Sequence, residues 1–132
     1  MTENAHDWLR IAEADLKASA LMQRFEDFPT GIHAFHCQQA VEKSLKAFLA
    51  ARARHFMARQ NLSYLLGLCA EVDPSFRQWE TQIAGLAPFT TQSIYPTDSN
   101  QTLTTAQARA YFEHANGIVS FVKAKLNPAG GR

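Results

Sequence analysis

The sequence predicts an all-α protein, a compact up-and-down bundle of about five helices in a single domain over residues 1–132. Three observations support this fold class. Apolar residues recur at steps of three and four, and no segment shows the alternation of a half-buried strand. The 132 residues are 46% hydrophobic, enough for one core. Capping residues, prolines and glycines divide the chain into helix-sized segments.

Two long helices are expected in the N-terminal half. The first should run from Asn4 to about Glu26, with Trp8 among the residues on its apolar side. Pro29 stands in the "DFPTG" segment, which should separate the two helices. The second should then run from about Ile32 to Arg54.

Two capping signals mark the next helices. Asn61 is expected to be the N-cap of a short third helix. Asp73 caps a fourth, because Pro74 follows it at the first helical position, where a missing amide hydrogen costs nothing.

A long connection separates the fourth helix from the last one. Residues 87–103 contain two prolines and show no helical period, and the segment is longer than the usual connection of roughly 2 to 8 residues. Its apolar residues predict an ordered loop packed on the bundle. The last helix should open with Thr104 and Gln107 at capping-box spacing and end in a frayed tail over residues 127–132.

Composition excludes several classes of protein. The 13 Lys and Arg nearly balance the 12 Asp and Glu, so no overall field attracts nucleic acid, although a local patch can still form. Cys37 and Cys69 are too few for a disulfide framework, and no secretory signal is recognised, which favours a cytoplasmic setting. No apolar stretch is long enough for a membrane span.

The second helix carries polar residues on its apolar side. Gln38 falls within the apolar stripe, and Glu42 and Lys46 continue its row at four-residue steps in the favourable order for an ion pair. Asp15 similarly falls on the apolar side of the first helix. Because a buried polar group without a partner costs about 1–3 kcal/mol, Gln38 and Asp15 should each face a polar group. That group is either a structural partner between the first two helices or a ligand or second subunit.

Several segments together resemble the HEPN domain family (higher eukaryotes and prokaryotes nucleotide-binding). The most specific is "QQAVEKSLKAFL", residues 38–49; "EADLKASALM", "QNLSYLL", "SIYP" and "ARAYFEHANGIVSFVKAKL" agree mainly in spacing. The resemblance implies an all-α bundle that is usually a homodimer, often encoded beside a small nucleotidyltransferase in a toxin–antitoxin or related two-component system. Some members are metal-independent ribonucleases, and others bind nucleotides or are non-catalytic partners.

The chain departs from the family pattern at two charged positions. Members of this type commonly have His-Asp-Leu where this chain has Gln60-Asn61-Leu62, and Arg-Tyr-Pro where it has Ile94-Tyr95-Pro96. Isoleucine cannot donate to a phosphate as a guanidinium does, and asparagine does not titrate near neutral pH. The departures favour a non-catalytic module.

The ribonuclease branch of the family carries an Arg and a His with four to six residues between them. Arg109 and His114 fit this spacing, and they would stabilise phosphate charge and move a proton. Five helical steps, however, rotate the two side chains about 140° apart. Ala110 also stands where the family usually has a polar residue. A ribonuclease toxin that uses this pair is therefore the alternative hypothesis.

For a binding function, the resemblance and the row on the second helix point to Gln38, Glu42 and Lys46, with Tyr95 in the long loop. The ligand would be a nucleotide, RNA or a nucleotidyltransferase, bound by a homodimer. The last helix or the long loop is the expected partner surface.

We expect no cofactor and no metal site. His33 and His36 stand three residues apart, but no third ligand follows at a matching helical position. One local basic cluster favours either a solvated helix end or a contact with RNA, a nucleotide or an acidic partner. It consists of Arg52, Arg54, His55 and Arg59.

Overall fold

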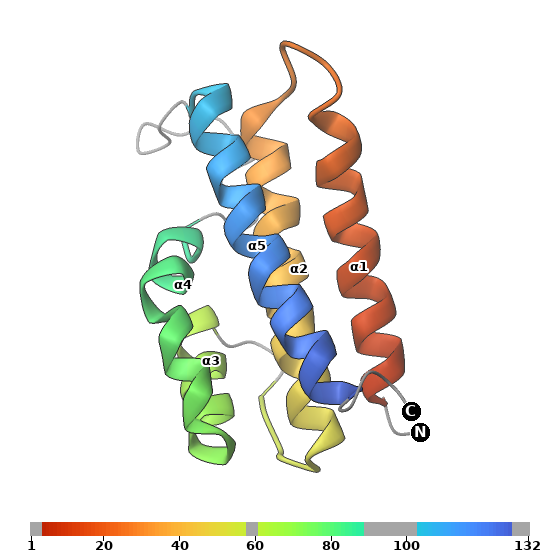
Figure 1. The fold of residues 1–132 in the computed structure, drawn as a ribbon, viewed down its shortest axis with the longest axis vertical. Coiled ribbons are helices and arrows are strands. Elements are labelled where there is room, and N and C mark those ends of the chain that lie inside the picture. The colour runs from red at the N-terminus through yellow and green to blue at the C-terminus, as the bar shows by residue number, and fades with distance from the viewer. Residues whose placement is uncertain (1–3, 58–60, 89–102, 128–132) are drawn as a thin grey trace.

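The computed structural model describes residues 4–57, 61–88 and 103–127, and within these ranges all regular structure is helical (Figure 1). The predicted all-α fold is confirmed. The elements in chain order are α1 (Ala5–Met22), α2 (Thr30–Ala51), α3 (Leu62–Val72), the 3₁₀-helix η1 (Pro74–Trp79), α4 (Glu80–Leu86) and α5 (Thr105–Leu126).

Helix α2 is the central element of the bundle. It packs along α1 on one side and α5 on another, and it also contacts α3. Figure 1 shows α1 antiparallel to α2, whereas α2 and α5 run in the same direction, with α3, η1 and α4 on the side away from α1. None of the described helices combines the length and the apolar content that crossing a bilayer requires.

The two long N-terminal helices have shorter or shifted bounds than expected. Helix α1 ends at Met22 rather than near Glu26, because the chain tightens into a turn in which the Arg24 amide donates to the Leu21 carbonyl at 3.2 Å. Helix α2 ends at Ala51, where Ala53 takes a left-handed conformation with φ 54°. That turn lets the amide of residue 54 return to the carbonyl of residue 49 at 2.9 Å, a common helix stop.

The predicted caps of α3 and α5 are confirmed. The Asn61 side chain accepts from the Tyr64 amide at 2.7 Å. Thr104 and Gln107 form the complete capping box, with the Gln107 amide bonded to the Thr104 hydroxyl at 3.0 Å and the reciprocal bond at 2.9 Å. Each cap satisfies amide groups that have no partner inside the helix.

Asp73 and Pro74 also start a helix, as expected, but its first turns are 3₁₀. The Asp73 carboxylate accepts from the Ser75 amide at 3.0 Å and from Lys125 of α5 at 2.8 Å. Lys125 and Ser75 lower the pKa of Asp73 from 3.8 to about 2. The cap therefore also fastens η1 to the end of α5.

The larger hydrophobic cluster is formed by α2, α3, α4 and α5, with η1 contributing Phe76, and a smaller one joins Leu9 of α1 to α2 and α5. The largest fully buried apolar side chains are Phe48, Phe76, Leu45, Leu49, Leu62, Leu65, Ile83, Leu86, Ile118, Val41 and Val122. The Trp79 ring lies so close to α5 that a Cβ on Gly117 would come within 3.1 Å of it. A glycine at this position permits that approach.

A buried polar cluster joins α1 to the first turns of α2. His33 is fully buried, and its Nε2 donates to the Gln23 side-chain oxygen at 2.8 Å. The Ser19 hydroxyl donates to the His33 carbonyl at 3.2 Å, and the Cys37 thiol donates to the Ser19 hydroxyl at 3.5 Å. Because these groups satisfy one another, the polar atoms are accommodated inside the bundle.

Burial sets the protonation of this cluster. Desolvation lowers the pKa of His33 to about 4, and the charge of Arg109 and then that of His36 contribute to the same shift. Desolvation also raises the pKa of Cys37 to about 11. Although His33 and Cys37 are neighbours, with Nδ1 and Sγ 3.9 Å apart, the thiol stays protonated and is not an activated nucleophile.

The stability of the fold should fall as the pH drops from about 6.5 to about 4. Over this window the unfolded chain protonates His33, whereas the folded chain keeps it neutral, so protons favour unfolding. Urea unfolding at several pH values would measure the slope, and NMR titration of the His33 ring would report its pKa. Asp73 contributes only at lower pH, between 3.8 and about 2. A flat stability profile above pH 5, or a ring that titrates at its ordinary value, would contradict the expectation.

Candidate binding site on the polar face of α2

Five polar side chains form a strip along α2 that runs from its buried side to its exposed edge: Gln38, Gln39, Glu42, Lys43 and Lys46. Gln38 is only 3% exposed, which confirms that it belongs to the apolar side of the helix. Its side-chain oxygen accepts from Gln39 Nε2 at 2.7 Å. The amide oxygen is thus satisfied by the neighbouring residue of the same helix.

Glu42 and Lys46 form the ion pair that their spacing predicted. Lys46 Nζ lies 3.0 Å from Glu42 Oε2, and the Lys46 side chain is 7% exposed while that of Glu42 is 20% exposed. The ammonium also lies 5.2 Å from the Trp8 ring centroid and 5.9 Å from that of Phe56. Two aromatic faces and a carboxylate compensate the burial of this charge.

The Trp8 side chain closes this corner of the strip. Its ring packs edge-on against Phe56, with centroids 6.2 Å apart. The indole Nε1 is buried and has no hydrogen-bond partner within the part of the chain that the structure describes.

Asp15 links α1 to the other edge of the strip. Its carboxylate accepts from His36 Nδ1 at 2.9 Å and from Lys43 Nζ at 3.0 Å, and its side chain is 15% exposed. The Asp15 carboxylate thus bonds to two residues of α2 other than Gln38. The sequence left open whether Asp15 faces a structural partner, a ligand or a second subunit. In the structure its carboxylate has structural partners, because it joins α1 to α2.

The two histidines of α2 serve separate partners. His33 bonds to Gln23 inside the bundle, and His36 bonds to Asp15 near the surface. Over residues 4–57, 61–88 and 103–127, no group of three or more His, Cys, Asp or Glu side chains is placed to hold a metal ion.

Arg109 and His114 have different neighbours. The Arg109 guanidinium donates to the Gln23 carbonyl at 3.0 Å and lies 5.2 Å from the Phe28 ring centroid. His114 instead has Tyr111 as its neighbour, with ring centroids 6.5 Å apart. Arg109 therefore ties α5 to the end of α1, a role that its spacing in the sequence did not indicate.

The basic cluster at the end of α2 is partly neutralised. Arg52 stacks over Phe48 at 4.5 Å, and Arg54 forms an ion pair with Glu71 at 2.7 Å. Arg59 lies outside the described residues, as do Gln60 and Tyr95. The proposed contribution of Tyr95 to a site stays a prediction.

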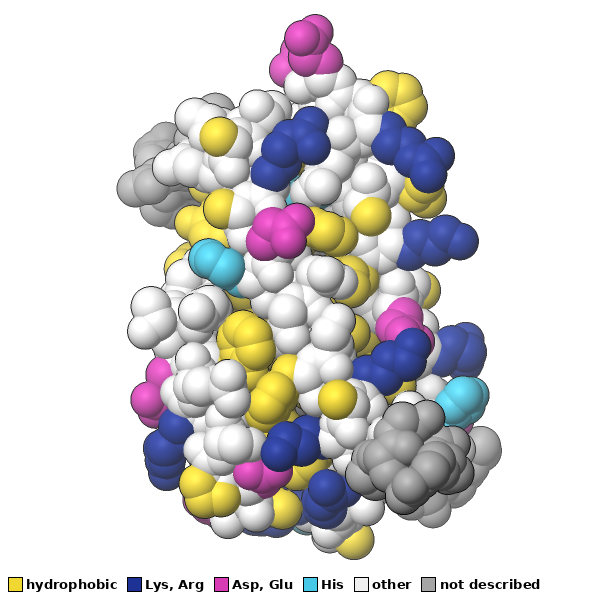
Figure 2. Space-filling view, in the orientation of Figure 1, with side chains coloured by type: hydrophobic (Ala, Val, Ile, Leu, Met, Phe, Trp, Pro, Cys, Tyr) yellow, Lys and Arg dark blue, Asp and Glu magenta, His cyan; other side chains and the backbone are white. Residues whose placement is uncertain are grey.

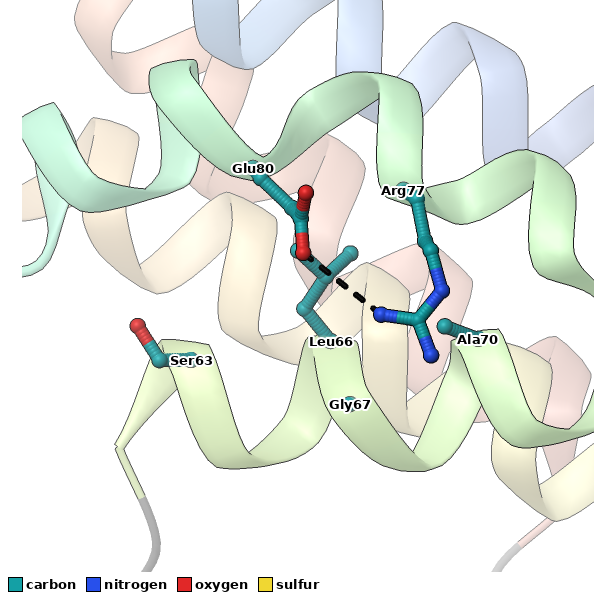
Figure 3. A pocket seen from close by; sticks show the side chains of 6 residues that line it. All are labelled: Ser63, Leu66, Gly67, Ala70, Arg77 and Glu80. Atoms are coloured by element: carbon teal, nitrogen blue, oxygen red, sulfur yellow. Dashed lines mark ion pairs between the residues drawn. The ribbon is translucent and has the colours of Figure 1, made fainter.

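Sequence patterns did not reveal a small hollow between α3 and η1, shown in Figure 3. It has a volume of about 160 Å³, with Ser63, Leu66, Gly67 and Ala70 along α3 facing the Arg77–Glu80 ion pair, whose atoms are 3.5 Å apart. A Cβ on Gly67 would meet nothing within 4 Å, so the missing side chain leaves the hollow open. Such a space can be recognised only after the two elements are packed.

Comparison with known proteins identifies the family. The family model for the HEPN domain matches residues 5–125. The crystal structure of TT1696 from Thermus thermophilus superposes with a TM-score of 0.72 at 23% sequence identity, covering 92% of this chain and 97% of that one. A search among curated proteins found no significant match. At this identity the structural neighbour shows the fold alone, but the family model spans all five α-helices, and the chain therefore belongs to the HEPN domain family.

Proposed function

We propose that this protein is a non-catalytic HEPN module that acts as a homodimer and binds a nucleotide, a small nucleotidyltransferase, or both. Its setting would be a two-component system of the toxin–antitoxin type. The observation that carries the proposal is that Arg109 and His114 have separate contacts: Arg109 donates to the Gln23 carbonyl at the end of α1, whereas His114 lies beside Tyr111 of its own helix. A module that keeps the family's α2 pattern without a converging catalytic pair fits binding better than cleavage.

Cleavage of RNA would require both groups at one phosphate. The guanidinium must face the developing negative charge while the imidazole reaches the ribose hydroxyl at hydrogen-bond distance. Arg109 already donates to a backbone carbonyl of the α1 end and covers an aromatic ring. Recruiting it for catalysis would break one of the contacts between α5 and the end of α1.

The edge of the α2 strip is the part that a ligand would reach first. Glu42 is 20% and Lys43 23% exposed along their side chains, whereas Gln38 and Lys46 lie beneath the surface. A carboxylate can accept from ribose hydroxyls or base amino groups, and an ammonium can pair with a phosphate. Gln38 and Lys46 would then support the contacting residues from below.

The outer face of α5 supports the homodimer. Its exposed residues include short side chains that share one side of the helix, which allow a second helix to approach closely. They are Ala106, Ala110, Asn116, Ser120 and Ala124. This face agrees with the expectation that the last helix takes part in the partner surface.

Purified protein should leave unstructured RNA intact in EDTA, because Arg109 and His114 do not converge. Gel analysis after incubation would show this, with Arg109→Ala and His114→Ala tested in parallel. Cleavage by the wild type that disappears in both variants, with circular dichroism unchanged, would overturn the non-catalytic proposal and support the ribonuclease alternative.

Nucleotide binding should depend on the Glu42 carboxylate. In calorimetric titrations with ATP, GTP and AMP, Glu42→Gln should weaken binding about tenfold, since a hydrogen bond to a charged group contributes roughly 1.5–3 kcal/mol. Glu26→Gln, an exposed site in the turn after α1, is the matched control and should bind as the wild type does. If no nucleotide binds, or if both variants behave alike, the nucleotide part of the proposal is wrong.

Light scattering should give a mass twice the 14.7 kDa of the chain. Ser120→Arg should shift the protein toward the monomer, because a long charged side chain prevents close approach of α5 to its copy. Ser63→Arg, on the exposed surface of α3, should leave the dimer intact. A mass of 14.7 kDa at all working concentrations would refute the dimer.

A further inference from the structure

The outer face of α1 carries an apolar stripe that the bundle does not cover. Ile11 is 38% and Leu21 42% exposed, and Ala14 and Ala18 lie between them at helical spacing. From position 11 to 21 the stripe extends about 15 Å at 1.5 Å per residue. Two large apolar residues separated by small ones form a shallow groove into which another helix can pack.

An apolar hollow continues this stripe beyond the end of α1. It has a volume of about 450 Å³ and is formed where the chain turns from α1 toward α2. Leu21 belongs to both features, and Phe25, 70% exposed, forms part of the wall. The remaining lining residues are Met22, Asp27, Phe28 and Pro29. A hollow with mainly apolar walls suits one large apolar side chain of a partner.

A row of basic side chains runs beside the stripe. Arg10 and Lys17 stand seven residues apart on α1, and Arg24 follows seven residues later in the turn; all three are exposed. Seven residues correspond to about 10.5 Å along a helix, the distance at which side chains of a packed partner helix repeat. Figure 2 shows dark blue side chains stepped along the right-hand edge of the molecule, with yellow side chains between them.

The charges on α1 indicate whether a second copy of α1 or a different helix would cover the apolar stripe. Of the acidic residues on α1, Glu13 is paired with Lys123 and Asp15 with Lys43, and Asp7 lies 3.9 Å from Arg10. A second α1 therefore brings no unpaired carboxylate toward the basic row. Within the row, Asp7 already lies near Arg10, so the acidic side chains of a partner would act mainly on Lys17 and Arg24.

We infer that the α1 surface, defined by Ile11, Ala14, Ala18 and Leu21 with the basic row beside it, binds an acidic amphipathic helix of a partner protein. The partner helix places its apolar side on the stripe and carboxylates against Arg10, Lys17 and Arg24. A large apolar residue near one end enters the hollow beside Phe25. This surface is separate from the α2 strip and from the outer face of α5, so the inference does not rest on the proposed function.

The test uses two labelled synthetic helical peptides of about 18 residues, long enough to span the surface at 1.5 Å per residue. Both carry Leu on one side and a Trp near one end; one has Glu and the other Lys at seven-residue intervals beside the Leu row. Fluorescence anisotropy should show that the protein binds the Glu peptide at least about tenfold more tightly than the Lys peptide, because the basic row attracts carboxylates and repels ammonium groups.

Matched variants locate the surface. Lys17→Glu should weaken binding of the Glu peptide about fivefold, and Lys17→Glu with Arg24→Glu should reverse the preference in favour of the Lys peptide. Arg77→Glu, an exposed charge reversal beside the α3 hollow, should change neither. Leu21→Asp should abolish binding of the Glu peptide, since it places a charge on the stripe. These residues are exposed, and circular dichroism would verify that each variant is folded.

Three results would overturn the inference. The first is no binding of the Glu peptide, and the second is equal binding of the two peptides or equal effects of Lys17→Glu and Arg77→Glu. The third is binding of a single-stranded oligouridine, lost in Lys17→Glu, without binding of the Glu peptide. That third result would assign the basic row to nucleic acid, which needs the charges but not the apolar stripe.

Discussion

The structure depends on the burial of α2 among α1, α3 and α5. More than half of the residues of this helix are buried, so the polar side chains on its packed sides need partners supplied by the chain. Asp15 supplies the central one, because its single carboxylate accepts from both His36 and Lys43 and fastens α1 to α2. Without that carboxylate, an imidazole and an ammonium would remain at a partly buried helix contact with no opposite charge.

The same requirement accounts for the rest of the polar face. Gln38 is satisfied by its neighbour Gln39, and Lys46 by Glu42 and two aromatic rings. The family pattern over residues 38–49 therefore has a structural explanation in this protein, in which polar groups hold one another in place. A binding role for Glu42 would be added to that arrangement, since its side chain keeps some exposure while the groups beneath it are fixed.

Arg109 and His114, whose spacing resembles that of a catalytic pair, also have different neighbours in the structure. Arg109 is a tether between α5 and the end of α1, and its charge reaches far enough to help keep the buried His33 neutral. His114 instead lies beside Tyr111 of its own helix. The spacing of the two residues matches a ribonuclease motif, but on a regular helix five steps rotate the side chains about 140° apart, and the two have different neighbours.

The sequence by itself determined the helical class, the helix starts at Asn61, Asp73 and Thr104, and the pairing of Glu42 with Lys46. These features depend on neighbours within one or two helical turns, which periodicity and capping chemistry describe. Only the tertiary structure decided the partners of Asp15 and Arg109, the hollow between α3 and η1, and the end of α1 at Met22. Each of these depends on residues far apart in the chain or on how a turn packs, and spacing along a sequence carries no information about which distant groups meet.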